Sequence, residues 1–369
     1  MFEAFEIKIG KYKQAIILNY AILTGEYPLF SFFRTVLTGR SHHVVTKSLS
    51  KHNEANEQEI AERISRYINA ATRDNTRKTY RSAVEHFEVH WGGKLPTSPE
   101  NIGRYLVTYA NDLAPSTLKT RLAALSQWHK TQGFADPCSS VHVRKIMRGI
   151  QAVHSKKPKQ AHPLQIEHLQ QITGSLDAQI RASENNASVQ RAYRDKALVL
   201  LGFWRGFRSD ELSRLMFEDL EIINNVCLRG YVRQSKTDRH NQGMYFEVPA
   251  LQTLCPVNAI SEFAAQIEMA NGPVFRKIDR WGKLNQNGIS AGSIPAILRR
   301  VLFQSNIPNS KEFSSHSLRR GFAHWANQQG WSLHELMQYV GWKDIQSAMR
   351  YLNHSDAFPN RLTQLNTRI

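Results

Sequence analysis

The chain has 369 residues, of which 41% are hydrophobic, which suits two or three domains with proper cores and excludes disorder throughout. Its formal net charge of +17 predicts a polyanionic partner, with nucleic acid as the first candidate. Charge alone leaves a solvated basic surface open, because many ribosomal and membrane-surface proteins are equally basic.

The cysteines and histidines do not form a recognisable metal or disulfide pattern. Cys138, Cys227 and Cys255 lack CxxC spacing, which indicates neither a disulfide framework nor a zinc site and fits a reducing cytoplasm. His86 and His90 are four residues apart on an expected helix, but no third ligand follows at a recognisable spacing. We therefore expect no bound metal.

Residues 1–56 differ in character from the rest, and we expect an N-terminal extension of unknown role. Their apolar stretch, residues 15–33, is interrupted by Asn19, Glu26 and Pro28. It is too short and too broken for a spanning helix, so no membrane association is expected. The extension is either an accessory arm or a stretch translated only if the assigned start is real.

Residues 57–153 predict a small helical domain. Ile60, Ile64 and Ile68 recur at four-residue spacing, and further apolar stripes follow over 76–91, 102–109, 115–133 and 141–153. Over residues 60–160 there are 17 Lys/Arg against 7 Asp/Glu, a one-sided balance typical of a DNA-binding module. The candidate phosphate contacts, which could equally be solvated charges, are Arg77, Lys78, Arg81, Lys119 and Arg121.

Residues 154–163 predict an interdomain linker, because they are polar and basic, contain two prolines and lack an apolar period. We hypothesise that Lys156, Lys157 and Lys159 lie along a phosphate backbone. From residue 164 to 369 the pattern is mixed. A helical run over 189–204 precedes short β-like pieces at 220–223, 227–232 and 245–248, and helices dominate from Pro256 onwards.

This mixed region carries residues suited to attack on a phosphodiester. Arginines grip phosphate oxygens through charged, bidentate contacts, and the candidate donors around one phosphate are Arg208, His316, Arg319 and Trp342. Late in the chain, the phenol of Tyr351 could become a covalent link to DNA. The sequence shows no carboxylate cluster of the kind a metal-dependent nuclease needs, because Asp210, Glu211, Glu218 and Asp219 suit ion pairing and helix capping.

These motifs together resemble the tyrosine recombinases of the phage integrase family over roughly residues 57–355. The resemblance rests on four motifs in family order: Gly206-Phe207-Arg208-Ser209-Asp210-Glu211-Leu212, Ser235-Lys236-Thr237-Asp238, His316-Ser317-Leu318-Arg319, and Gly341-Trp342 followed by Tyr351. An isolated HxxR motif carries almost no information, whereas this order and spacing is a strong signal.

The resemblance implies a role for each matching residue. Tyr351 is the expected nucleophile, Arg208 and Arg319 hold the scissile phosphate, and Lys236 is the general acid. His316 assists proton movement or bonds the phosphate. Two positions depart from the usual pattern: Trp342 stands where most members have His, and Ser317 replaces an Asp often found in the family, which affects support for Arg319. Tyr339 and Arg205 are the nearest rivals to Tyr351 and Arg208.

The implied fold is mainly α with a small β-sheet: a helical core-binding (SAM-like) domain at 57–153 and an α+β catalytic domain at 164–369, forming a C-shaped DNA clamp. The implied activity is site-specific DNA recombination or integration, as in phages and mobile elements, through a 3′-phosphotyrosyl intermediate and without a cofactor. The implied partners are double-stranded DNA with paired inverted half-sites and a homotetramer on DNA. A non-catalytic DNA-binding regulator, a metal-dependent nuclease or transposase, and a monomeric topoisomerase-like activity remain alternatives.

Overall fold

The structure is a computed structural model that describes residues 59–68, 70–154, 160–233, 242–269 and 271–351. The chain divides into two compact units, Met1–Pro158 and Lys159–Ile369. The expected extension at 1–56 and the candidates Lys156, Lys157, Lys159 and Lys236 lie outside the described residues. None of the helices in the described ranges combines the length and apolar character needed to cross a bilayer.

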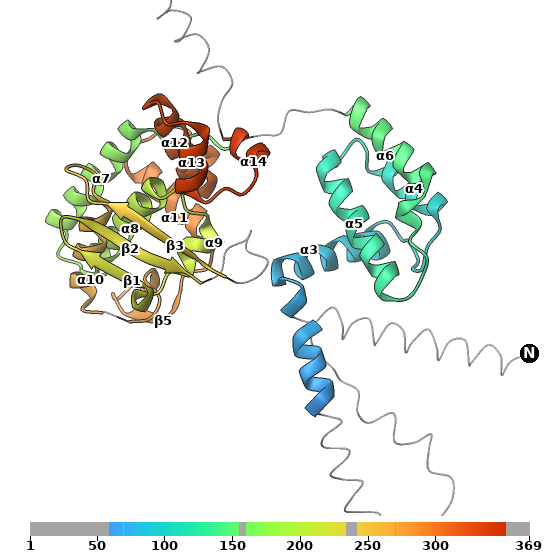
Figure 1. Cartoon of the computed structure of the whole chain (residues 1–369), viewed down its shortest axis with the longest axis horizontal. Coiled ribbons are helices and arrows are strands. Elements are labelled where there is room, and N and C mark those ends of the chain that lie inside the picture. The colour runs from blue at the N-terminus through green and yellow to red at the C-terminus, as the bar shows by residue number, and fades with distance from the viewer. Residues whose placement is uncertain (1–58, 69, 155–159, 234–241, 270, 352–369) are drawn as a thin grey trace, which may run out of the picture. The chain divides into compact units, whose positions relative to one another are not determined.

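The first unit is helical, as the sequence predicts (Figure 1). Pro99 and Pro115 each stand in the first turn of a helix, where the missing N–H costs no hydrogen bond, and Ser98 and Ser140 cap the helices that follow them. The hydrophobic core of this unit contains Phe87, Tyr105 and other buried side chains. The elements are α3 (Asp74–Glu85), η1 (His86–His90), α4 (Pro99–Thr108), α5 (Pro115–Thr131), η2 (Pro137–Ser139) and α6 (Val141–Val153).

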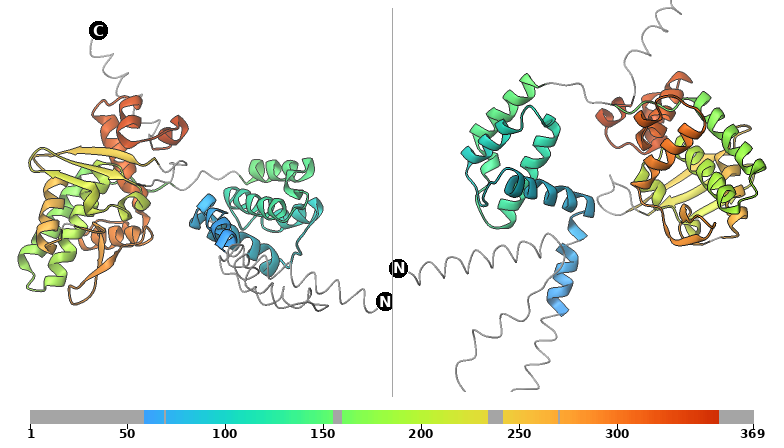
Figure 2. Two further views of the ribbon diagram at one scale, coloured as in Figure 1. Left: turned by 60° about the horizontal axis from the view of Figure 1, so that its bottom comes forward. Right: turned by 180° about the vertical axis from the view of Figure 1, so that it is seen from behind.

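The second unit combines helices with a three-stranded antiparallel sheet of order β1-β2-β3. Figure 1 and its reverse view in Figure 2 show the sheet on one side of the unit, with helices across one of its faces. The elements before and within the sheet are α7 (Ile166–Ala182), α8 (Asn186–Trp204), α9 (Ser209–Ser213), η3 (Phe217–Asp219), β1 (Leu220–Ile223), β2 (Cys227–Val232) and β3 (Met244–Pro249).

The helices after the sheet complete the core around α8, most of whose residues are buried. One hairpin among them, β4 paired with β5, was not predicted from the sequence, which indicated that helices dominate from Pro256 onwards. The remaining elements are α10 (Pro256–Ile267), β4 (Arg276–Ile278), β5 (Leu284–Gly288), α11 (Ser293–Gln304), η4 (Ser310–Glu312), α12 (Ser315–Gln328), α13 (Leu333–Val340) and α14 (Ile345–Met349).

The segment that enters the second unit lies directly against α12. The backbone N–H of Leu164 donates to the carbonyl of Ser317 at 3.0 Å. A Cβ atom on Gly321 would overlap the carbonyl oxygen of Leu164, so only glycine permits this approach. The chain is therefore fixed at Leu164, on the helix that carries the HxxR motif.

Candidate active site

Arg208 is held at the start of α9 by a buried carboxylate. Glu211 accepts the backbone N–H of Arg208 at 2.8 Å and its Nη1 at 2.7 Å. The side chain of Glu211 is 2% exposed and that of Arg208 is 17% exposed. Glu211 thus caps the helix and orients the guanidinium with the same carboxylate, which leaves the outer edge of Arg208 open to solvent.

Arg319 lies deeper, in α12, where it is 1% exposed. Its Nη1 donates to the carbonyl of Gly206 at 2.7 Å and lies 3.8 Å from Oε2 of Glu211. Gly206 has φ +62°, a left-handed conformation that suits glycine. Burial first, and then the charge of Arg208, lower the pKa of Arg319 to about 9.

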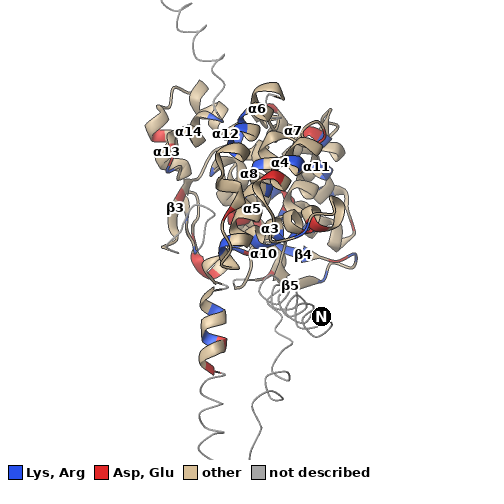
Figure 3. Cartoon of the chain, turned by 90° about the vertical axis from the view of Figure 1, so that its right-hand side faces the viewer, with Lys and Arg blue, Asp and Glu red and all other residues tan. Residues whose placement is uncertain are grey.

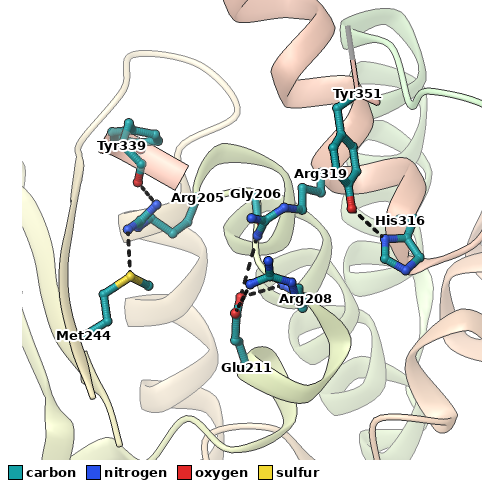
Figure 4. Close-up of polar contacts among 9 residues, drawn as sticks. All are labelled: Arg205, Gly206, Arg208, Glu211, Met244, His316, Arg319, Tyr339 and Tyr351. Atoms are coloured by element: carbon teal, nitrogen blue, oxygen red, sulfur yellow. Dashed lines mark hydrogen bonds and ion pairs between the residues drawn. The ribbon is translucent and has the colours of Figure 1, made fainter. Parts of the chain in front are cut away.

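The phenol of Tyr351 lies beside His316 and above the buried indole of Trp342. Its hydroxyl is 3.2 Å from Nδ1 of His316. The Tyr351 and Trp342 rings are stacked with centroids 5.1 Å apart. The Arg319 guanidinium lies 4.9 Å from the Trp342 centroid and 5.8 Å from the Tyr351 centroid. Arg319 therefore contacts both the indole and the phenol, and Figure 4 shows Arg319 beside Tyr351 and His316.

Three buried donors at this site are left without a hydrogen-bond partner in the described part of the chain: Nε and Nη2 of Arg319 and Nε1 of Trp342. Buried donors are normally satisfied, and an unsatisfied one costs the free energy of desolvation. The lowered pKa of Arg319 indicates the same deficit, because its cation is buried without a full counter-charge. The site is therefore chemically suited to an anion with several oxygen acceptors.

The structure brings together Arg208, His316, Arg319, Trp342 and Tyr351, whereas Lys236 is outside the described residues. The rival residues have other partners. Tyr339 donates its hydroxyl to the carbonyl of Trp204 at 2.9 Å, and burial raises the pKa of Tyr339 to about 12. Arg205 is buried and donates to the carbonyl of Tyr339.

Two supports of Arg319 were not identified from the sequence: the carbonyl of Gly206 and the carboxylate of Glu211. The Arg-x-x-Glu spacing at a helix start signals the capping role of Glu211 but not its reach to a second arginine. Ser317 stands at the position where the family often has an Asp, a replacement expected to affect the support of Arg319. Its side chain is buried and its hydroxyl accepts the N–H of Ser314 at 3.0 Å. In this chain Ser317 completes the N-terminal cap of α12.

The candidate DNA contacts of the first unit divide into two groups. Lys78, Arg81 and Lys119 are exposed on α3 and α5, and Figure 3 shows cationic residues on the helices of both units. Arg77 forms an ion pair with Asp74. Arg121 is partly buried and donates to the hydroxyl of Tyr105 at 3.1 Å, so of its two alternatives the plain solvated charge does not apply, while its role as a phosphate contact stays a prediction.

His86 and His90 stack with ring centroids 5.1 Å apart. Burial, together with the neighbouring charge of Arg121, lowers the pKa of His86. Across the described ranges, the structure contains no group of three or more His, Cys, Asp or Glu side chains that could hold a metal ion.

Comparison with known proteins places this geometry in a family. Residues 175–357 match the phage integrase family. An integrase/recombinase XerD homolog from Selenomonas ruminantium is 28% identical over 312 residues, which covers 82% of this chain and 88% of that protein. The recombinase Cre of Escherichia phage P1 is 21% identical over 290 residues, covering 73% and 80% of the two chains.

Solved structures show the same fold. The XerH site-specific recombinase bound to a palindromic difH substrate, in a post-cleavage complex, matches with a TM-score of 0.56 and 18% identity over 95% of this chain and 93% of that chain. The Tn1549 transposon integrase in complex with transposon right end DNA matches with a TM-score of 0.54 and 15% identity over 83% and 98%. The expectation of a mainly α fold with a small β-sheet is confirmed, and the sheets of the described residues are antiparallel. Residues 175–357 therefore form a domain of the phage integrase family of tyrosine recombinases, the enzymes that cleave and rejoin DNA at specific sites.

Proposed function

We propose that this recombinase breaks DNA by attack of the Tyr351 hydroxyl on a phosphate held by Arg208 and Arg319. The observation that carries the proposal is the set of three unsatisfied donors on Arg319 and Trp342, which lie against the Tyr351 ring. A scissile phosphate supplies the acceptors that these donors lack. Guanidinium groups then neutralise the charge that develops at phosphorus.

In the proposed step, the phenolate oxygen forms a bond to phosphorus and the bond from phosphorus to the 5′-oxygen breaks. The products are a 3′-phosphotyrosine and a free 5′-hydroxyl. A free phenol has a pKa of about 10, so the cationic site favours its ionisation. His316, 3.2 Å from the hydroxyl, is placed to accept the phenolic proton. Trp342 only donates hydrogen bonds and cannot carry a proton.

The leaving 5′-oxygen needs a proton, and we propose Lys236 as its source on the strength of the family resemblance. Attack by the freed 5′-hydroxyl of another strand reverses the chemistry and rejoins the backbone. The phosphotyrosine retains the energy of the broken bond, so neither a nucleotide cofactor nor a metal ion is part of the proposed mechanism.

A nicked substrate that loses a short 5′-hydroxyl fragment tests the proposal, because religation then becomes impossible. We expect a covalent protein–DNA adduct that persists in denaturant and in excess chelator, with the DNA attached to the peptide containing Tyr351. A non-catalytic regulator would give no adduct. A metal-dependent nuclease would give chelator-sensitive cleavage without an adduct.

We propose that the helical domain, 57–153, and the catalytic domain, 164–369, close around the duplex as a C-shaped clamp joined by the linker at 154–163. The division of the chain between Pro158 and Lys159 supports the two-domain organisation that this proposal requires. The exposed cations Lys78, Arg81 and Lys119 are the proposed contacts to the phosphate backbone. By family resemblance, four protomers assemble on two sites that each contain inverted half-sites. The unpaired thiols of Cys138, Cys227 and Cys255 fit the proposed cytoplasmic location.

Replacing Lys156, Lys157 and Lys159 together by glutamine is expected to weaken DNA binding and flatten its salt dependence. Each lost phosphate contact reduces the slope of log K against log salt by about 0.9. Fluorescence anisotropy at several salt concentrations measures that slope. The matched control replaces three exposed lysines elsewhere, Lys277, Lys283 and Lys311, which changes net charge equally. An equal effect in both triple variants would show that total charge, and not the linker, determines affinity.

A further inference from the structure

Arg205 is the residue that directly follows α8, three residues before the phosphate-binding candidate Arg208, but its contacts are with other residues. It is 4% exposed. Its Nη1 donates to the main-chain carbonyl of Tyr339, and its Nη2 lies 4.0 Å from the sulfur of Met244 (Figure 4). One side chain therefore links α8 to the last turn of α13 and to the first residue of β3.

Met244 and the end of α13 also touch each other directly. Gly341 follows α13 with φ +73°, and a Cβ atom at this position would lie 2.6 Å from the Met244 sulfur. The Tyr339 carbonyl and Met244 contact the Arg205 guanidinium, and Gly341 lies close to Met244. We call these four residues the Arg205 brace. Trp342 is the residue that immediately follows the brace.

The surroundings of Arg205 are poor in counter-charge. Its guanidinium lies 5.0 Å from the Tyr339 ring centroid, 5.8 Å from that of Phe207 and 5.9 Å from that of Phe246. Within the described residues, no carboxylate lies at ion-pair distance from it, and its Nε has no partner. Burial lowers its pKa. Burying a cation among aromatic rings costs free energy that an apolar side chain would not. We therefore expect the hydrogen bonds of Arg205 to fix the positions of its partners.

The residue that follows the brace, Trp342, belongs to the candidate active site. The Trp342 ring is stacked on Tyr351 with centroids 5.1 Å apart, and the Arg319 guanidinium lies 4.9 Å from the Trp342 centroid. A shift of the turn at Gly341 would move the indole relative to both groups. Misplacement of reacting groups by about 1 Å costs on the order of 10²-fold in rate.

We propose that Arg205 is a positioning residue: it holds the Tyr339 carbonyl and Met244 so that the turn at Gly341 presents Trp342 to Tyr351 and Arg319. The inference rests on the proposed function of Tyr351. Arg205 touches neither DNA nor the reacting atoms, and it acts through the placement of the indole under the nucleophile.

The test compares single-turnover cleavage of the nicked substrate by wild-type protein, Arg205→Gln and Arg205→Lys at a temperature at which all remain folded. We expect unchanged DNA affinity and cleavage slowed by on the order of 10- to 100-fold for Arg205→Gln. The loss should be smaller for Arg205→Lys, because an ammonium retains the charge but cannot contact the Tyr339 carbonyl and the Met244 sulfur at the same time. The matched control is Arg194→Gln, a change at an arginine that is 5% exposed in the same unit and donates to Asp195 and the carbonyl of Arg276.

Three outcomes overturn the inference: cleavage by Arg205→Gln at the wild-type rate, an equal slowing by Arg194→Gln, or recovery of Arg205→Gln on DNA with a 5′-bridging sulfur. The sulfur leaves without a proton, so recovery would place the defect in the general acid and not at the nucleophile.

A second, independent test uses the substitution Met244→Leu. Because both residues belong to one brace, Arg205→Lys combined with Met244→Leu should cost less than the product of the two single losses, and strict multiplicativity would contradict the brace. Absence of an adduct with wild-type protein would instead reject the proposed function.

Discussion

Replacing Tyr351 by phenylalanine is expected to abolish the covalent adduct and recombination while DNA binding remains at the wild-type level. The substitution removes the attacking oxygen and its contact with His316, but it keeps the ring that stacks on Trp342. Loss of a covalent nucleophile lowers rates by on the order of 10⁴-fold or more. Denaturing gels that resolve protein-linked DNA measure the adduct, and mobility shifts measure binding.

Tyr245→Phe is the matched control, because Tyr245 lies in the same unit and is 83% exposed on β3. We expect it to form the adduct at the wild-type rate. An adduct formed by Tyr351→Phe at a normal rate would show that a different residue attacks the phosphate, and the mechanism proposed above would then be wrong.

Arg319→Lys is expected to lower the cleavage rate by on the order of 10²- to 10³-fold, the scale of losing a preorganised donor to developing charge. In Arg319, Nη1 donates to the carbonyl of Gly206, and Nε and Nη2 remain available to an anion. A lysine supplies one compact charge and cannot serve both at once. Single-turnover cleavage under saturating protein measures the chemical step apart from binding.

Burial lowers the pKa of Arg319, because its cation lies in the protein interior without a full counter-charge. A bound phosphate would supply that counter-charge. The matched control is Arg299→Lys, which loses a bond from Nε to the carbonyl of Phe313 outside the site. Comparable slowing in both variants would attribute the effect to packing.

Much of the fold was predictable because its signals are local. Strands 220–223 and 227–232 match the expected ranges, since Asn224 and Asn225, two of the three residues between them, favour a turn. The third strand extends from Met244 to Pro249, one residue beyond each expected end. The hairpin of β4 and β5 was missed because Leu284–Gly288 is rich in Asn and Gln, and its pairing depends on contacts that are distant in sequence.

The candidate site was predictable as a set of residues but not as an arrangement. Arg208, His316, Arg319, Trp342 and Tyr351 stand near helix ends or in turns, and their order along the chain carried the resemblance. Their burial did not follow from the pattern: an arginine expected to meet phosphate is 1% exposed. Nor could spacing show that Arg205 faces aromatic rings while Arg208 faces outward, because that depends on the turn at Gly206.

The contact of Leu164 with α12 separates the length of the proposed linker from the position of the helix that carries His316 and Arg319. Leu164 is fixed to α12 by its bond to Ser317 and its approach to Gly321, so the proposed linker at 154–163 ends next to a fixed point of the second unit. If that linker joins the two units as proposed, lengthening it dilutes the effective concentration of one unit around the other, roughly as the −3/2 power of its length. Such insertions adjust avidity for DNA without displacing the helix on which His316 and Arg319 stand.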